Sequence, residues 1–142
     1  MYNTKFIMKN NVIKLIKYVY YCSLIGLLIL YLFPGSLLGY LFYGNLGKQP
    51  DLISNPMGTS INHIIAFFYL SVMGLISSIR NTQFYQVIIF LILLSIILEL
   101  FHYFIPNRSF QLIDLFGNLI GTLLAIFVIL FYRKIIENDK KI

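Results

Sequence analysis

The chain has 142 residues, of which 59% are hydrophobic and only 11% are charged. Ordinary soluble domains carry about 25% charged residues, so this chain lacks the side chains that a water-facing surface needs. The length is that of one domain. The net charge is +6, and the Lys and Arg residues gather beside the apolar runs. This pattern is typical of membrane flanks and not of a nucleic-acid groove, so we expect no nucleic-acid partner.

Four apolar stretches predict an all-α integral membrane four-helix bundle. Each is long enough, or nearly so, to cross about 30 Å of hydrocarbon. They lie at about 18–33, 61–79, 84–105 and 112–132. Pro34 and Gly35 follow the first stretch, and Pro106 and Asn107 follow the third, as expected where helices end. We interpret 18–33 as a retained helix rather than a cleaved signal, preceded by a basic segment, 1–17, and we expect a basic tail at 133–142.

The distribution of Lys and Arg predicts that both termini face the cytoplasm. Nine of these residues then lie inside, at positions 5, 9, 14, 17, 80, 133, 134, 140 and 141. Only Lys48 and Arg108 lie outside. Because cytoplasmic segments carry the excess of positive charge, the opposite orientation is disfavoured.

The first outer loop, 35–60, has two parts. Residues 37–43 are apolar and aromatic but too few to cross a membrane, and we expect them at the membrane interface. Residues 45–57 are polar and contain Gly and Pro, which predicts a loop. The single cysteine, Cys22, excludes an internal disulfide, and we expect it to be a small core residue.

Polar residues converge on the outer ends of three predicted helices. Glu99, His102 and Tyr103 have the i, i+3, i+4 spacing of one helix face. Asp114 and Asn118 share a face of the next helix, which is antiparallel and therefore brings them to similar depths. His63 lies near the outer start of the second helix, and Arg108 lies in the turn between the last two. Ionisable groups in hydrocarbon are costly, so this set favours a functional polar site.

Three functions fit these residues. As a binding site, Arg108 would hold a phosphate or carboxylate, paired with Glu99 or Asp114, while further polar groups orient the ligand. The ligand-binding candidates are Arg108, Asp114, Asn118, Tyr103 and Ser109. As an enzyme, the protein would use Glu99 as general acid or base with His63 or His102. As a structural or assembly protein, it would use the same groups only to join helices.

Two further expectations concern metals and partners. No standard metal spacing is present, and we predict no metal and no cofactor. Gly117 and Gly121 form a G-x-x-x-G face, which suits close packing inside the protomer or in a homo-oligomer. His63, Phe67, Ser71, Gly74 and Ser78 form a helical stripe that predicts another packing face.

The segment from Glu99 to Gly121 resembles the VanZ-like family. It reads E-L-F-H-Y-F-I-P-N-R-S-F-Q-L-I-D-L-F-G-N-L-I-G, and the family pattern is E-x-x-Q-x-F-x-P-x-R-S-F followed by D-x-x-x-N-x-x-G. His63-Ile-Ile-Ala-Phe67 is similar to the family's H-F-x-A-Y segment. Two departures are that His102 replaces the usual Gln, and that Thr59-Ser60 replaces the usual Asp-Lys.

The resemblance implies a small multi-pass protein of the bacterial cytoplasmic membrane, with a link in some members to resistance against glycopeptides such as teicoplanin. It implies no settled reaction. Combined with the polar site, it predicts binding of a cell-envelope ligand, such as an anionic lipid head group, a lipid-linked cell-wall intermediate or a glycopeptide. The expected partners are therefore membrane lipids or lipid-linked envelope intermediates.

Overall fold

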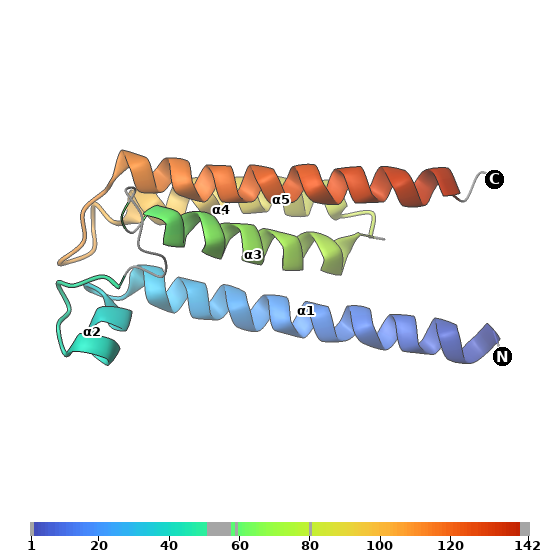
Figure 1. The fold of residues 1–142 in the computed structure, drawn as a ribbon, viewed down its shortest axis with the longest axis horizontal. Coiled ribbons are helices and arrows are strands. Elements are labelled where there is room, and N and C mark those ends of the chain that lie inside the picture. Colours follow the sequence, from blue (N-terminus) through green and yellow to red (C-terminus); the bar gives the residue numbers. More distant parts are fainter. Residues whose placement is uncertain (1, 51–57, 59, 80, 140–142) are drawn as a thin grey trace.

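The computed structural model describes the backbone of residues 2–50, 58, 60–79 and 81–139, and the side chains of 11–135 within those ranges. In this part of the chain all regular structure is helical. The helices are α1 (Tyr2–Leu32), α2 (Leu37–Tyr43), α3 (Ser60–Ser78), α4 (Phe84–Phe101) and α5 (Leu112–Asp139). Figure 1 shows α1, α3, α4 and α5 running side by side, with both chain ends at one end of the bundle and α2 at the other.

Within the described ranges, four helices are long and apolar enough to cross a membrane, as predicted. The candidate spans are Asn11–Leu32, Ser60–Ser78, Phe84–Phe101 and Leu112–Ile135. Many of their large apolar side chains are exposed, including Ile25, Phe90 and Phe127. Lipid tails are as apolar as leucine, so such a surface is stable in a bilayer and not in water. The chain is therefore a multi-pass membrane protein.

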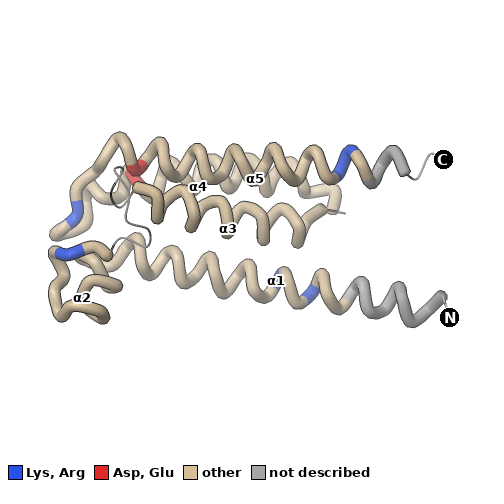
Figure 2. Tube along the Cα trace, viewed as in Figure 1, with Lys and Arg blue, Asp and Glu red and all other residues tan. Residues whose placement is uncertain are grey.

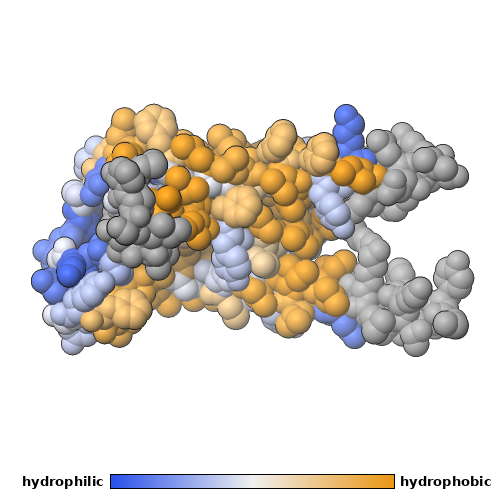
Figure 3. Space-filling model, in the orientation of Figure 1, coloured by the Kyte–Doolittle hydropathy of each residue, from blue (hydrophilic) through white to orange (hydrophobic). Residues whose placement is uncertain are grey.

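Charged and polar groups lie toward the ends of this bundle. Figure 2 shows the acidic residues at the end that carries α2, with basic residues at both ends. In the face shown in Figure 3, apolar residues cover the middle and polar residues cover the α2 end. Cys22 is exposed on α1 and not a core residue as we expected, because the lipid-facing side of a membrane helix accepts the same small apolar residues.

Two helices are longer than the apolar runs indicated. The first begins at Tyr2 instead of about residue 18, so most of the basic segment 1–17 continues α1. The last extends past 132 to Asp139, so Arg133 and Lys134 are helical. Lys and Arg are good helix formers, and no Gly or Pro interrupts either extension. Hydrophobicity limits the membrane-crossing part, whereas helix propensity extends the helix into the flanks.

The fourth helix is shorter than predicted, ending at Phe101 and not at Ile105. The amide groups of His102, Tyr103 and Phe104 bond three residues back, which tightens the chain into turns. Pro106 and Asn107 then occupy the middle of a turn closed by the bond from Arg108 N to Ile105 O, 3.2 Å. Asn107 has a φ of 58°, a conformation that asparagine tolerates.

The outer loop contains the short helix α2. Ser36 caps its start by accepting a hydrogen bond from Gly39 N, and Gly44 ends it with a φ of 65°. Tyr40, Leu41 and Phe42 on α2 are exposed. The predicted loop 45–57 is irregular over residues 45–50, and its remainder lies outside the described residues.

Small residues bring α3 and α5 together. A Cβ atom on Gly117 would lie 2.9 Å from the carbonyl oxygen of Ser60, and one on Gly121 would overlap with that of Ile64. The Gly117/Gly121 face is thus used inside the protomer, between α3 and α5. The stripe from His63 to Ser78 is buried as predicted. On its α1 side, a Cβ on Gly74 would press on the ring of Tyr20.

Candidate functional site

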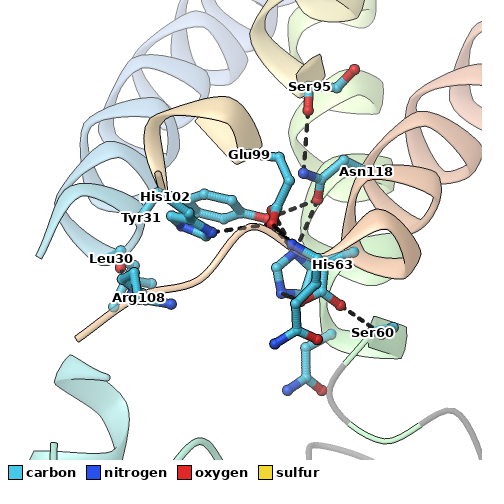
Figure 4. Close-up of polar contacts among 12 residues, drawn as sticks. Leu30, Tyr31, Ser60, His63, Ser95, Glu99, His102, Arg108 and Asn118 are labelled. Carbon is cyan, nitrogen blue, oxygen red and sulfur yellow. Dashed lines mark hydrogen bonds and ion pairs between the residues drawn. The ribbon is translucent and has the colours of Figure 1, made fainter. Parts of the chain in front are cut away.

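Polar side chains from all four long helices meet at the α2 end of the bundle. They are called the polar cluster here, and each is less than a tenth exposed. Its members are Tyr31 of α1, Ser60 and His63 of α3, Glu99 of α4, His102 just beyond α4, and Asp114 and Asn118 of α5. Figure 4 shows their side chains converging. The sequence analysis predicted that five of these residues converge, and the structure adds Tyr31 and Ser60 to them.

The centre of the polar cluster joins Tyr31, His63 and Asn118. The Tyr31 hydroxyl donates to Asn118 Oδ1 at 2.8 Å and lies 2.7 Å from His63 Nδ1. Asn118 Nδ2 donates to the carbonyl oxygen of Ser95 at 3.2 Å, which orients the amide with Oδ1 toward the other two. His63 Nδ1 is also 3.1 Å from Asn118 Oδ1. Because the hydroxyl hydrogen is used toward Asn118, His63 Nδ1 must carry a hydrogen and act as a donor.

Asp114 is held from two sides. The Ser60 hydroxyl donates to its Oδ1 at 2.5 Å, and His63 Nε2 lies 3.6 Å from its Oδ2. Asp114 lies in the first turn of α5, where the helix dipole also favours a negative charge. His63 therefore stands between Asp114 on one side and Tyr31 with Asn118 on the other.

Glu99 lies near the end of α4, where it is fully buried beside the start of α5. Its Oε1 accepts a hydrogen bond from the backbone N–H of Gln111 at 3.1 Å and lies 3.2 Å from His102 Nδ1. Its Oε2 is 4.0 Å from His63 Nδ1 and has no hydrogen-bond partner among the described residues. A buried polar atom without a partner is costly, so this oxygen is a point where a water or ligand group would be stabilised.

His102 is oriented by Glu99 and by Tyr31. The His102 ring stacks on the Tyr31 ring with centroids 5.4 Å apart and planes at 17°. With Nδ1 directed at Glu99, its Nε2 is buried and has no hydrogen-bond partner in the described part of the chain. His102 also lines a polar pocket, described below.

Arg108 does not form the predicted pair with Glu99 or Asp114. Its Nη2 donates to the carbonyl oxygen of Leu30 at 2.7 Å, and its Nε to that of Phe33 at 3.5 Å. These are unpaired carbonyl groups at the end of α1, which favour a cation. Burial lowers the pKa of the Arg108 guanidinium from its ordinary value. Figure 4 shows Arg108 directed toward Leu30, to the side of the polar cluster.

Two predicted ligand-binding residues lie outside the polar cluster. Tyr103 is exposed and stacks on Phe110 with centroids 4.8 Å apart, so it does not share a face with Glu99. The predicted shared face of Glu99 and Tyr103 was wrong, because i+4 spacing aligns side chains only while the α-helix continues. Here α4 ends at Phe101. Ser109 is exposed as well, yet it borders the polar pocket.

Two pockets adjoin the polar cluster. The polar pocket, of about 180 Å³, is bordered by His63, His102, Arg108, Ser109 and Asp114 among others. The apolar pocket, of about 170 Å³, lies between α1, α2 and α3 and is bordered by Leu27, Leu30, Leu37, Leu38 and Ala66 among others. Four residues border both pockets: Ser36, Gln49, His63 and Arg108.

The described residues contain no group of three or more His, Cys, Asp or Glu side chains that could hold a metal ion. Asp114 Oδ1 accepts a hydrogen bond from Ser60 and Glu99 Oε1 accepts one from the Gln111 amide, and the two imidazoles lie beside these carboxylates. Side chains that border the polar pocket can form hydrogen bonds and pair with charge.

Tyr31 is a member of the polar cluster that the sequence analysis did not single out. It lies near the end of α1 and is buried. A signal was present, because Tyr20, Leu24, Leu27 and Tyr31 follow the i, i+4, i+7, i+11 spacing of one helix face. All four belong to the buried or partly buried core.

Comparison with known proteins gives no relative for this chain. No family model matches it, and neither a curated protein nor a solved structure matches it. The fold and the site define it as a multi-pass helical membrane protein with a buried polar cluster at one end.

Proposed function

We propose that this protein is a VanZ-like protein of the bacterial cytoplasmic membrane that binds the anionic head group of a cell-envelope ligand at the outer face. The observation that carries the proposal is that the Arg108 guanidinium borders the same polar pocket as His102, whose buried Nε2 has no hydrogen-bond partner among the described residues. Arg108 uses Nη2 and Nε toward α1, and Nη1 has no hydrogen-bond partner within the described ranges.

A guanidinium and an imidazole that border one pocket suit a phosphate or carboxylate. Charge-assisted hydrogen bonds from guanidinium to such groups are among the strongest in proteins. Arg108 is held in place by its bonds to Leu30 and Phe33, so little side-chain entropy would be lost on binding. Glu99 and Asp114 would oppose an anion, but each already accepts hydrogen bonds from inside the protein, and His63 lies between them.

The resemblance to the VanZ-like family supports the same residues. Glu99, Arg108, Asp114 and Asn118 match its pattern, and all but Arg108 belong to the polar cluster. Ser60 stands where the family pattern has Lys, and here its hydroxyl donates to Asp114 without adding a positive charge. Arg108 is then the permanent cation bordering the polar pocket. A role in glycopeptide resistance would follow if the ligand is a cell-wall intermediate that the antibiotic also binds.

Native mass spectrometry of the purified protein tests this proposal. Wild type is compared with Arg108→Gln and with Lys48→Gln, which removes a charge beside α2 but outside the lining of both pockets. Loss of a co-purifying anionic lipid or lipid-linked sugar from the Arg108 variant alone is the expected result. If both variants retain the same molecules as wild type, the binding proposal is wrong. Equal loss from both indicates attraction to general surface charge and also contradicts a specific site.

A hydrolase or transferase acting on a lipid-linked substrate is a second candidate, favoured by the Glu99–His102 pair. A carboxylate that orients one nitrogen of an imidazole bordering a pocket is an arrangement used for general base catalysis. Ser60 does not fit a nucleophile, since its hydroxyl donates to Asp114 and not to an imidazole. The base would thus act on water or on a substrate hydroxyl.

His102→Gln separates the two candidates. A glutamine amide can still hydrogen-bond a head group but cannot accept and release a proton at neutral pH. Binding alone predicts that His102→Gln retains the ligand within about threefold, whereas catalysis predicts loss of turnover. Should Arg108→Gln and Glu99→Gln only lower the thermal midpoint, with no ligand found in wild type, the polar cluster would be a structural device.

A further inference from the structure

We infer that the ligand is a single amphiphile, a phosphate carrying a hydrocarbon chain, with its head group in the polar pocket and its chain in the apolar pocket. This inference rests on the proposed head-group site and specifies the class of molecule that occupies it. A water-soluble anion or a glycopeptide without a lipid chain would fill only the polar pocket.

The position of the two pockets is the first argument. Ser36, Gln49, His63 and Arg108 border both, so the polar and apolar pockets adjoin at these four residues. Arg108 borders both pockets, and its side chain combines an aliphatic stem with a charged head group. The change from polar to apolar lining across one set of residues matches the change along a lipid phosphate.

The lining and depth of the apolar pocket are the second argument. Leu27 and Leu30 come from the span of α1, and Ala66 comes from α3, six residues after its start at Ser60. At 1.5 Å per residue, Ala66 lies roughly 9 Å along α3 from the Ser60 end. An alkyl chain entering there would stay at the depth of lipid tails. Each methylene buried tightens binding by about fourfold.

The third argument comes from α2, which borders the apolar pocket. Leu37 and Leu38 line it, whereas Leu41 and Phe42 are 67% and 69% exposed. Exposed aromatic and aliphatic residues of this kind settle at the interface between head groups and tails. Placing α2 there would bring the pocket to the level at which lipid phosphates lie.

The test uses two probes with the same head group, ethyl phosphate and dodecyl phosphate, added to the protein in phosphatidylcholine nanodiscs. Ala66→Phe fills the apolar pocket, and Leu38→Gln makes its α2 wall polar without changing the α1–α3 contact. Ile65→Phe adds the same ring to an exposed neighbouring position and is the matched control. Thermal midpoints of all variants are measured to show that they remain folded.

We expect wild type and Ile65→Phe to bind dodecyl phosphate at least tenfold more tightly than ethyl phosphate. In Ala66→Phe and Leu38→Gln this preference should fall to less than threefold, with ethyl phosphate unchanged. If wild type binds both probes equally, the amphiphile inference is overturned and the head-group site stands. If the preference survives both pocket variants, the chain lies elsewhere and the pocket assignment is wrong. If wild type binds neither probe, the proposed function itself fails.

Discussion

The hydroxyl oxygen of Tyr31 lies 2.7 Å from Nδ1 of His63, and this contact joins α1 to α3 inside the bundle. The same hydroxyl donates to Asn118 of α5, so one side chain connects three helices. Deep in a membrane protein no bulk water replaces a lost partner. A hydroxyl that bonds to side chains of two other helices therefore fixes how these helices align. The position of α1 relative to both pockets thus depends on Tyr31.

Tyr31→Phe should lower stability by about 1–2 kcal/mol. The phenyl ring keeps its contacts with His102 and Phe67, but Asn118 loses a donor and His63 loses an acceptor. The thermal midpoint in detergent measures the change. Tyr69→Phe is the control, because Tyr69 accepts only an exposed 3.3 Å bond from Ser23. An equal shift in the two variants would contradict a special role for Tyr31.

Gly121→Ala should destabilise the protein by about 1–3 kcal/mol or more, since the added Cβ would meet the backbone of α3 at Ile64 and Phe68. Backbone atoms cannot move aside as a flexible side chain does. Gly26→Ala is the matched control, because a Cβ there meets nothing within 4 Å and alanine favours the helix. We expect the Gly26 variant to be as stable as wild type or slightly more so. A neutral Gly121→Ala would show that α3 and α5 do not pack this closely.

Ser60→Ala should cost about 1–3 kcal/mol, because Asp114 Oδ1 would be left buried without its hydroxyl donor. Ser77→Ala provides the comparison, since the Ser77 hydroxyl only bonds the Gly74 carbonyl within the same helix. That variant should remain within about 0.5 kcal/mol of wild type. Thermal unfolding of both, measured in one detergent, decides the point. A small effect at Ser60 would mean that water replaces the hydroxyl.

Membrane orientation remains a prediction from the Lys and Arg distribution, and labelling tests it. In a Cys22→Ser background, Asn45→Cys places a thiol at the α2 end and Thr82→Cys places one between α3 and α4. With the N-terminus inside, a membrane-impermeant thiol reagent should label the Asn45 variant in intact cells and the Thr82 variant only after permeabilisation. The reverse pattern would place the polar cluster on the cytoplasmic side.

The distribution of apolar and charged residues along the chain determined the architecture, because hydrophobicity acts through each residue independently of its neighbours in space. Four apolar runs and few charges require helices that satisfy their own backbone groups in lipid, and the four spans were found near the predicted positions. Helix ends were less predictable, as α4 shows. Its end depends on the three-residue hydrogen bonds that His102, Tyr103 and Phe104 form before Pro106. These turns move Tyr103 away from the helix face that carries Glu99.

The polar cluster was largely predictable because antiparallel neighbours bring equal depths together. His63, Glu99, His102, Asp114 and Asn118 meet as the spacing indicated. What only the tertiary structure decided is which partner each group takes. Arg108 bonds to carbonyl groups of α1, 78 residues away in the chain at Leu30, and Tyr31 of α1 completes the cluster. Such choices depend on the rotation and approach of packed helices, which local sequence does not specify.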